Sequence, residues 1–99
     1  MNLVFLSGKI ISDIEFKFII NSKKISIASF WIEIDSKLLE QGNESMHKNV
    51  RQNTEKNIIK INAYDEKADY IYRRLKLNDY ICIYGKMEQN SVNVLTIEK

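Results

Sequence analysis

The 99-residue sequence predicts an all-β domain, a five-stranded barrel with one helix between the third and fourth strands. Three observations lead to this prediction. Several segments alternate between apolar and polar residues, as strands with one face in a core do. Residues 65–76 instead place their apolar residues at the spacing of a helix that packs on one side. The length suits one domain, residues 1–99, and leaves no room for a second.

The first two long strands are predicted over residues 3–11 and 24–34. The residues expected to face the core are Val4, Leu6, Gly8 and Ile10 in the first strand and Ala28, Phe30, Ile32 and Ile34 in the second. Gly8 marks a bend or a close backbone approach, which a curved barrel strand needs. Between the two strands lie a further apolar stretch, residues 14–20, and the turn signal Asn21-Ser22-Lys23.

A polar segment without periodicity, residues 36–56, follows the second strand. It is either a solvated insertion or a loop that grips a ligand, because loops of this length in compact domains are often one or the other. We expect residues 38–55 to be mobile without ligand, since they combine high polarity with the turn pair Gly42-Asn43.

The third strand, residues 57–64, has an unusual outer face. Its inner residues are Ile59, Ile61 and Ala63, and its outer residues are Ile58, Lys60, Asn62 and Tyr64. The outer face therefore carries a cation, an amide and a ring side by side. Rings that stack on bases and cations that follow phosphates are what a surface for single-stranded nucleic acid needs.

The remaining elements complete the pattern. The helix over residues 65–76 begins at Asp65, a good N-cap, and its buried stripe is Ala68, Ile71, Tyr72 and Leu75. The fourth strand, residues 80–87, has Ile81, Ile83 and Met87 inside and Tyr80, Cys82, Tyr84 and Lys86 outside. A hairpin turn, Gln89-Asn90-Ser91, leads into a last strand over residues 91–99, whose inner face the pattern leaves open.

Five curved strands with one helix at this position describe the OB-fold, a partly open Greek-key barrel. An SH3-like barrel lacks the helix. A ferredoxin-like sheet needs a helix between its first two strands, where none fits in this sequence.

Composition argues against several classes of function. The net charge of +2 is too mild to indicate nucleic acid by itself. The single cysteine, Cys82, excludes an internal disulfide and a cysteine-based zinc site, and nothing supports its pairing with the single histidine, His47. The sequence has no phosphate-binding glycine loop, no cluster of metal ligands and no nucleophile–base spacing. We therefore expect that the protein is not an enzyme and that it uses no metal and no cofactor. With no signal peptide and no apolar run near the ~20 residues of a membrane span, we expect a cytoplasmic protein with no membrane contact.

Several motifs carry a resemblance to a known family. The opening NLVFLSGKIISDIEFKF is similar to that of bacterial single-stranded-DNA-binding proteins, with Ile14 where that family usually has proline. The matching residues there are Asn2, Leu6, Gly8, Ile10, Asp13 and Glu15. IASFWIEI resembles the family's second strand, and IIKINAYDEKADYIYRRLKLNDYICIYGKM, with Tyr64 at the aromatic position and Ala68 in the helix, is the closest match. The resemblance covers about residues 2–87.

The resemblance implies largely sequence-independent binding of single-stranded DNA, in replication, recombination or repair, by base stacking and phosphate contacts. The residues expected to bind are Trp31, Lys48, Arg51, Lys56, Lys60, Asn62, Tyr64, Tyr80, Tyr84 and Lys86. For the rings an alternative stays open: Tyr64 packs beside the helix, Trp31 is an interface residue, and Tyr80 and Tyr84 belong to a covered subunit contact.

The chain also departs from the family pattern. It has one tryptophan where the family presents several, and it ends at Lys99 without a flexible linker and acidic tip. In length and in the LSG of its first strand it is similar to the primosomal replication protein PriB, so a primosomal adaptor with mainly protein partners is an alternative function. An OB-fold used only for protein or RNA contact is a third.

The first strand predicts self-association. Its outer residues are Leu3, Phe5, Ser7 and Lys9, so two apolar side chains stand where a monomer should be polar. An exposed apolar edge strand invites pairing, and the resembled family associates through this strand. We expect a homodimer or a homotetramer, with replication proteins as further partners.

Overall fold

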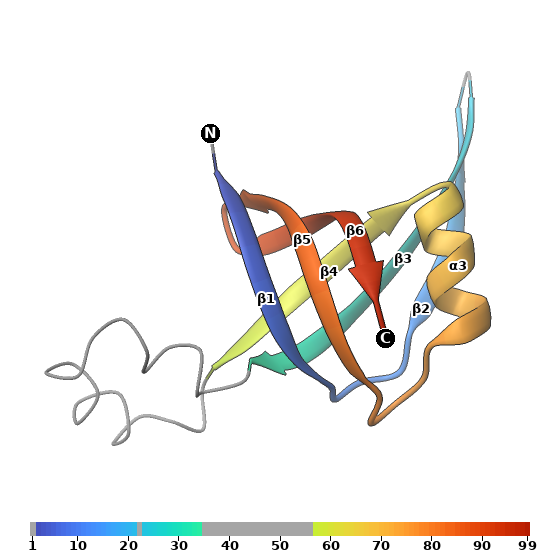
Figure 1. The fold of residues 1–99 in the computed structure, drawn as a ribbon. Coiled ribbons are helices and arrows are strands. Elements are labelled where there is room, and N and C mark those ends of the chain that lie inside the picture. Colours follow the sequence, from blue (N-terminus) through green and yellow to red (C-terminus); the bar gives the residue numbers. More distant parts are fainter. Residues whose placement is uncertain (1, 22, 35–56) are drawn as a thin grey trace, which may run out of the picture.

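The computed structural model describes residues 2–21, 23–34 and 57–99 (Figure 1). Its elements in chain order are β1 (Leu3–Ile10), β2 (Glu15–Ile20), β3 (Lys24–Ile34), β4 (Ile58–Tyr64), α3 (Glu66–Arg74), β5 (Tyr80–Glu88) and β6 (Ser91–Glu98). The predicted loop over residues 36–56, its expected mobility and the predicted binding residues Lys48, Arg51 and Lys56 lie outside the described residues.

The sheet closes into a barrel. Its strand order is β1-β5-β6-β4-β3-β2, and β1 also pairs with β3. The strands β1, β5, β6, β4 and β3 therefore form a closed ring of five, with α3 between β4 and β5 along the chain (Figure 1). The predicted OB-fold is confirmed, including the position of its helix.

The sixth strand, β2, extends the barrel and does not take part in its closure. It pairs with Lys24–Ser29 of β3, and β1 pairs with Ile32–Ile34 on the same edge of β3. β1 and β2 together thus occupy the place of one bent strand along β3. This explains why six strand segments form a five-stranded barrel. The hairpin of β2 and the first half of β3 reaches beyond the barrel (Figure 1).

The core consists mainly of residues that alternation predicted, to which Val92 and Val94 of β6 are added. Those fully or almost fully buried from the strands are Ile10, Ala28, Phe30, Ile32, Ile61, Ala63, Ile81, Ile83, Val92 and Val94. Val4, Leu6, Ile34, Ile59 and Met87 pack against them and are partly buried. The predicted inner faces of the first four barrel strands are therefore confirmed.

The inner face of β6, which alternation left open, changes at a bulge. Its register with β5 shifts between Tyr84, which pairs with Thr96, and Gly85, which pairs with Val94. Leu95 falls between these partners and is exposed, and the alternation resumes one residue later, with Ile97 against the core. An inserted residue of this kind breaks the period of two that identifies a strand face.

Gly8 lies at a close backbone approach, as predicted. It pairs with Ile34 of β3 and Ile81 of β5, so two strands flank it. A Cβ atom at this position would overlap the backbone carbonyl of Glu33. Barrel closure at this point therefore requires glycine.

The helix α3 is shorter than predicted and buries most of the predicted stripe. Ala68, Ile71 and Leu75 are buried. The prediction that Tyr72 belongs to the core is wrong, because 56% of its surface is exposed. Its ring stacks on Phe16 of β2 instead, with 4.7 Å between the ring centroids and 19° between the planes.

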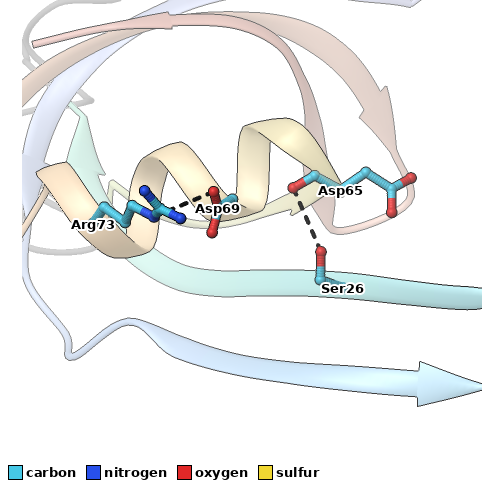
Figure 2. A network of polar contacts seen from close by, with 4 residues as sticks. All are labelled: Ser26, Asp65, Asp69 and Arg73. Atoms are coloured by element: carbon cyan, nitrogen blue, oxygen red, sulfur yellow. Dashed lines mark hydrogen bonds and ion pairs between the residues drawn. The ribbon is translucent and has the colours of Figure 1, made fainter.

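The start of α3 is fastened to β3. Asp65 occupies the predicted N-cap position, but its side chain makes no capping hydrogen bond. Its backbone N–H donates to the Ser26 carbonyl at 2.9 Å. The Ser26 hydroxyl donates to the Asp65 carbonyl at 3.5 Å (Figure 2). One turn later, the Arg73 side chain pairs with Asp69 at 3.3 Å. The two bonds between Asp65 and Ser26 tie the end of β4, where Tyr64 lies, to β3.

Candidate nucleic-acid interface

Four of the predicted binding residues lie together on the outer face of β3 and β4. The register places Trp31 opposite Lys60, Ser29 opposite Asn62 and Ile27 opposite Tyr64. Directly opposite residues have Cβ atoms about 4.5–5.5 Å apart, so a ring and a cation are neighbours. Trp31 is 43% exposed and Tyr64 is 41% exposed. The interface built from these residues is called the β3–β4 face below.

Two hydrogen bonds along one edge of β3 hold the backbone of Trp31, although the residue is exposed. Its N–H donates to Ser12 Oγ at 2.9 Å, and its carbonyl accepts from the Ile11 N–H at 3.0 Å. Both partners belong to the link between β1 and β2, at the point where β3 changes from one partner strand to the other. The ring therefore projects from a fixed position.

A side-chain hydrogen bond fixes the next pair. The Ser29 hydroxyl donates to Asn62 Oδ1 at 2.8 Å. The amide group of Asn62 is thereby oriented by its neighbour across the strand, and both side chains are only partly buried.

A hollow of about 390 Å³ adjoins Trp31, Lys60 and Asn62. Its other side is formed by residues 88–91, the hairpin between β5 and β6. This hairpin reaches the face because β6 runs parallel to β4, with Ser91 beside Lys60 and Asn93 beside Asn62. The turn itself could be predicted, but a parallel pairing between residues about 30 positions apart leaves no local signal.

Lys17 of β2 also lies on this face, although no sequence pattern pointed to it. It pairs with Ile27, which in turn pairs with Tyr64, so Lys17 is two strands from that ring. Two strand spacings are about 10 Å, within the combined reach of a lysine and a tyrosine. The side of the sheet on which Lys17 lies depends on the register of β2 with β3. The continuous apolar run of β2 does not specify this register.

Tyr80 and Tyr84 lie elsewhere. On β5, Tyr80 pairs with Lys9 of β1 and Tyr84 pairs with Phe5. In Figure 1, β1 and β5 run side by side in front, while β4 and β3 cross behind them. These two rings therefore accompany the residues predicted for self-association. The surface of Leu3, Phe5, Ser7, Lys9, Tyr80, Cys82 and Tyr84 is called the β1–β5 face below.

Lys86 stands between the two faces. It pairs with Leu3 of β1 on one side and with Asn93 of β6 on the other. Since Asn93 pairs with Asn62, Lys86 is two strands from the β3–β4 face. Of the predicted residues, the structure thus brings together Trp31, Lys60, Asn62 and Tyr64, with Lys86 at the border.

The first strand is less of an edge than the sequence suggested. β1 pairs with β5 from Leu3 to Lys9, and Gly8–Ile10 also pair with β3 because the barrel closes there. Only residues 3–7 have a single partner strand within the described part of the chain. Phe5 on this segment is 65% exposed, so the apolar outer surface that motivated the prediction is present.

The described residues contain no group of three or more His, Cys, Asp or Glu side chains placed to hold a metal ion. No helix in residues 2–21, 23–34 and 57–99 is long and apolar enough to cross a membrane.

The model of the single-strand binding protein family matches residues 1–96. No curated protein sequence matches. Among solved structures, the SSB domain of a Synechococcus protein has a TM-score of 0.71 at 13% identity, covering 100% of this chain and 96% of that one.

Two other solved structures have the same fold. The single-stranded DNA binding protein from Thermus aquaticus has a TM-score of 0.72 at 14% identity, with 100% of this chain and 40% of that chain covered. The second single-stranded DNA binding protein from Mycobacterium smegmatis has a TM-score of 0.61 at 14% identity, covering 98% and 86%. Identities this low establish a shared fold, whereas the family model spans nearly the whole sequence. The chain therefore belongs to the single-strand binding protein family.

Proposed function

We propose that this protein binds single-stranded DNA through the β3–β4 face, largely independently of sequence, in DNA replication, recombination or repair. The observation that carries the proposal is the pairing of Trp31 with Lys60 on an exposed sheet surface, with Tyr64 further along the same strands. Family membership and the names of the similar structures support the same ligand.

The spacing of the two rings suits a strand of nucleic acid. Trp31 and Tyr64 occupy register positions four residues apart along β3 and β4, which is about 13 Å at 3.3 Å per residue. A few nucleotides span this distance, within the site sizes of about 4–16 nucleotides known for OB-folds. Stacking tolerates every base, because each base has a π-face.

The cations on this face supply the phosphate contacts. Lys60 lies opposite Trp31 in the register, Lys17 lies two strands across from Tyr64, and Lys86 lies at the border of the β3–β4 face. Each neutralised phosphate of a single strand contributes a slope of roughly 0.7 to the dependence of log affinity on log salt. The predicted residues Lys48, Arg51 and Lys56 would add to these contacts.

We further propose that the β1–β5 face is a contact between copies of the chain, in a dimer or a dimer of dimers. Leu3, Phe5 and Tyr84 are exposed side by side there, an arrangement that favours burial against a partner. Tyr84 would then be covered, which agrees with its separation from Trp31 and Tyr64.

The same apolar surface favours one alternative. A primosomal adaptor would use it to dock another replication protein and would bind DNA only weakly. A protein that sediments as a monomer and binds DNA poorly would support this alternative over the first proposal.

Intrinsic fluorescence tests the DNA proposal directly, because Trp31 is the single tryptophan. The protein is titrated with dT and rU oligomers of equal length at two salt concentrations. Strong quenching by dT that weakens at higher salt is expected. Absent quenching would contradict the proposal, and stronger binding of rU than dT would redirect it to RNA.

A further inference from the structure

The outermost strand of the sheet, β2, has a free edge. It comes last in the strand order β1-β5-β6-β4-β3-β2, and within the described residues it pairs with β3 alone. Its other edge therefore presents a row of backbone N–H and C=O groups to an added strand. The hairpin that β2 forms with the first half of β3 projects past the barrel and past α3, so neither element stands in the way at its tip (Figure 1).

This edge lacks the features that usually keep edge strands apart. Proteins protect such edges with proline, with bulges or with charged side chains. The chain has no proline, and the register of β2 with β3 runs without a shift from Glu15 to Ile20. The charges on β2, Glu15 and Lys17, both lie in its first half. The second half is apolar, and Phe18, Ile19 and Ile20 are 53%, 41% and 75% exposed. The tip half of the edge therefore favours pairing.

The sequence of β2 suits pairing with a second copy of itself. Two identical antiparallel strands are related by a two-fold axis, so one residue at the centre faces its own copy. Centres at Lys17 and at Phe18 pair five of the six residues, and other centres pair fewer. A centre at Lys17 would place two ammonium groups opposite each other, which is unfavourable. A centre at Phe18 sets ring against ring. It also sets Lys17 opposite Ile19 and Phe16 opposite Ile20, so no like charges meet.

We propose that β2 pairs antiparallel with β2 of a second copy, centred on Phe18, when two copies bind the same DNA strand. The pairing joins two sheets in the order β4-β3-β2-β2-β3-β4. Because the two-fold axis is perpendicular to the sheet, the β3–β4 faces of both copies lie on the same side of it. The inference rests on the proposed DNA binding only for what brings the two copies together.

DNA is needed because the contact is small. Stable protein–protein interfaces involve about 20–30 residues a side, whereas this contact is one strand of six residues. At micromolar concentration without DNA it is therefore not expected to hold, and the β1–β5 face decides the oligomeric state. Binding to one DNA strand raises the effective concentration of the second copy to about millimolar.

Disulfide trapping tests both the contact and its register. Cys82, the single cysteine, is exposed and is first replaced by serine. In that background Phe18→Cys places two thiols opposite each other, with Cα atoms about 4.5–5.5 Å apart, within the range of a disulfide. Ile20→Cys is the matched control. Its Cα lies four residues from its own copy, about 13 Å along the strand.

Each variant is oxidised at micromolar concentration without DNA, with a dT oligomer of about 12 nucleotides and with one of about 40, lengths for one and for several OB-fold sites. Quenching of Trp31 in the same samples reports binding. We expect about 10-fold more Phe18→Cys dimer with the longer oligomer than with the shorter one. The Ile20→Cys dimer should stay at background. A mixture of Lys17→Cys and Ile19→Cys, which retains the Phe18 ring, should form a heterodimer with the same dependence on length.

The outcomes separate this contact from the proposed function. Quenching without a cross-link, at position 18 or between positions 17 and 19, would overturn the contact and leave DNA binding intact. The edge would then be open to an extended segment of another protein. Equal cross-linking of Phe18→Cys and Ile20→Cys would indicate random collision and would also overturn the contact.

Absence of quenching would overturn the DNA proposal instead. Phe18→Cys and Ile20→Cys are then oxidised without DNA at about millimolar protein, the effective concentration that a shared strand would supply. A cross-link specific to position 18 would support the pairing of the two β2 strands, and its absence would overturn that pairing as well.

Discussion

The β3–β4 face and the β1–β5 face both expose aromatic rings on barrel strands, yet their neighbours differ. Across from Trp31 stands Lys60, and a hydrogen-bonded Ser29–Asn62 pair and a hollow lie next to it. Across from Tyr84 stands Phe5, an apolar ring. Exposed rings therefore do not identify a nucleic-acid surface by themselves. The residue directly opposite decides whether a ring is better suited to a base or to another protein surface.

Phe5→Glu should have the largest effect, because it places a charge at the centre of the β1–β5 face. An unpaired buried charge costs about 3 kcal/mol or more, which corresponds to a more than 100-fold weaker association. Sedimentation velocity at micromolar concentration should shift from oligomer to monomer. Tyr70→Glu, which changes an exposed ring on α3, is the control and should sediment like the wild type. A wild-type protein that is already monomeric would refute the predicted contact.

Tyr64→Ala tests the other face. Loss of one stack should weaken binding of poly-dT by about 1–3 kcal/mol, with little change in the salt dependence. Tyr84→Ala is the matched comparison, because its ring lies on the β1–β5 face and should leave the intrinsic dT affinity of each site nearly unchanged. If Tyr64→Ala binds dT normally but melts at a lower temperature, its ring serves packing and the distinction between the faces fails.

Lys60→Ala removes a charge and leaves both rings in place. The slope of log affinity against log salt should fall by roughly 0.7, the value for one phosphate of a single strand. Titrations at four or more salt concentrations measure it. Lys67→Ala, on the exposed part of α3, is the control and should leave the slope unaltered. An unaltered slope in Lys60→Ala would mean that DNA does not pass over this lysine.

Lys17→Ala should have the smallest effect, because this lysine is two strands from Tyr64 and lies at the edge of the proposed DNA path over the β3–β4 face. We expect the salt slope to fall by less than the ~0.7 of a full phosphate contact. Lys24→Ala is matched to it on the same hairpin, but the Lys24 ammonium lies over the Phe18 ring at 4.7 Å, on the opposite surface. Equal effects of the two variants would show that position on the β3–β4 face is irrelevant.

The fold was largely predictable, because alternation and helical spacing are local. Inner residues such as Phe30, Ile61 and Ile83 follow from a period of two, and Ala68 and Ile71 from a helical stripe. The pattern left a strand face open where that period is interrupted, and a prediction was wrong where an element finds an unforeseen neighbour. Leu95 at the bulge is an example of the first, and Tyr72 against Phe16 is an example of the second.

The site was predictable only in part, for a related reason. Trp31, Lys60, Asn62 and Tyr64 belong to two strands that are consecutive in the barrel, so their common face could be expected. Lys17 and the hairpin at residues 88–91 depend on pairings with β2 and β6, which no local pattern specifies. The placement of Tyr84 beside Phe5 likewise depends on which strand lies next to β5.

The residue after Tyr64 gives the β3–β4 face one further property. Asp65 has a φ of 56° and a ψ of −120°, a conformation that costs a residue other than glycine about 1–3 kcal/mol. The protein retains this strain, and the two bonds to Ser26 hold the chain in place there. If Tyr64 stacks on a base as proposed, the backbone that carries its ring is already ordered before the base arrives. The strain at Asp65 would then be the cost of this preorganisation, and less of the stacking energy would be spent on ordering the chain.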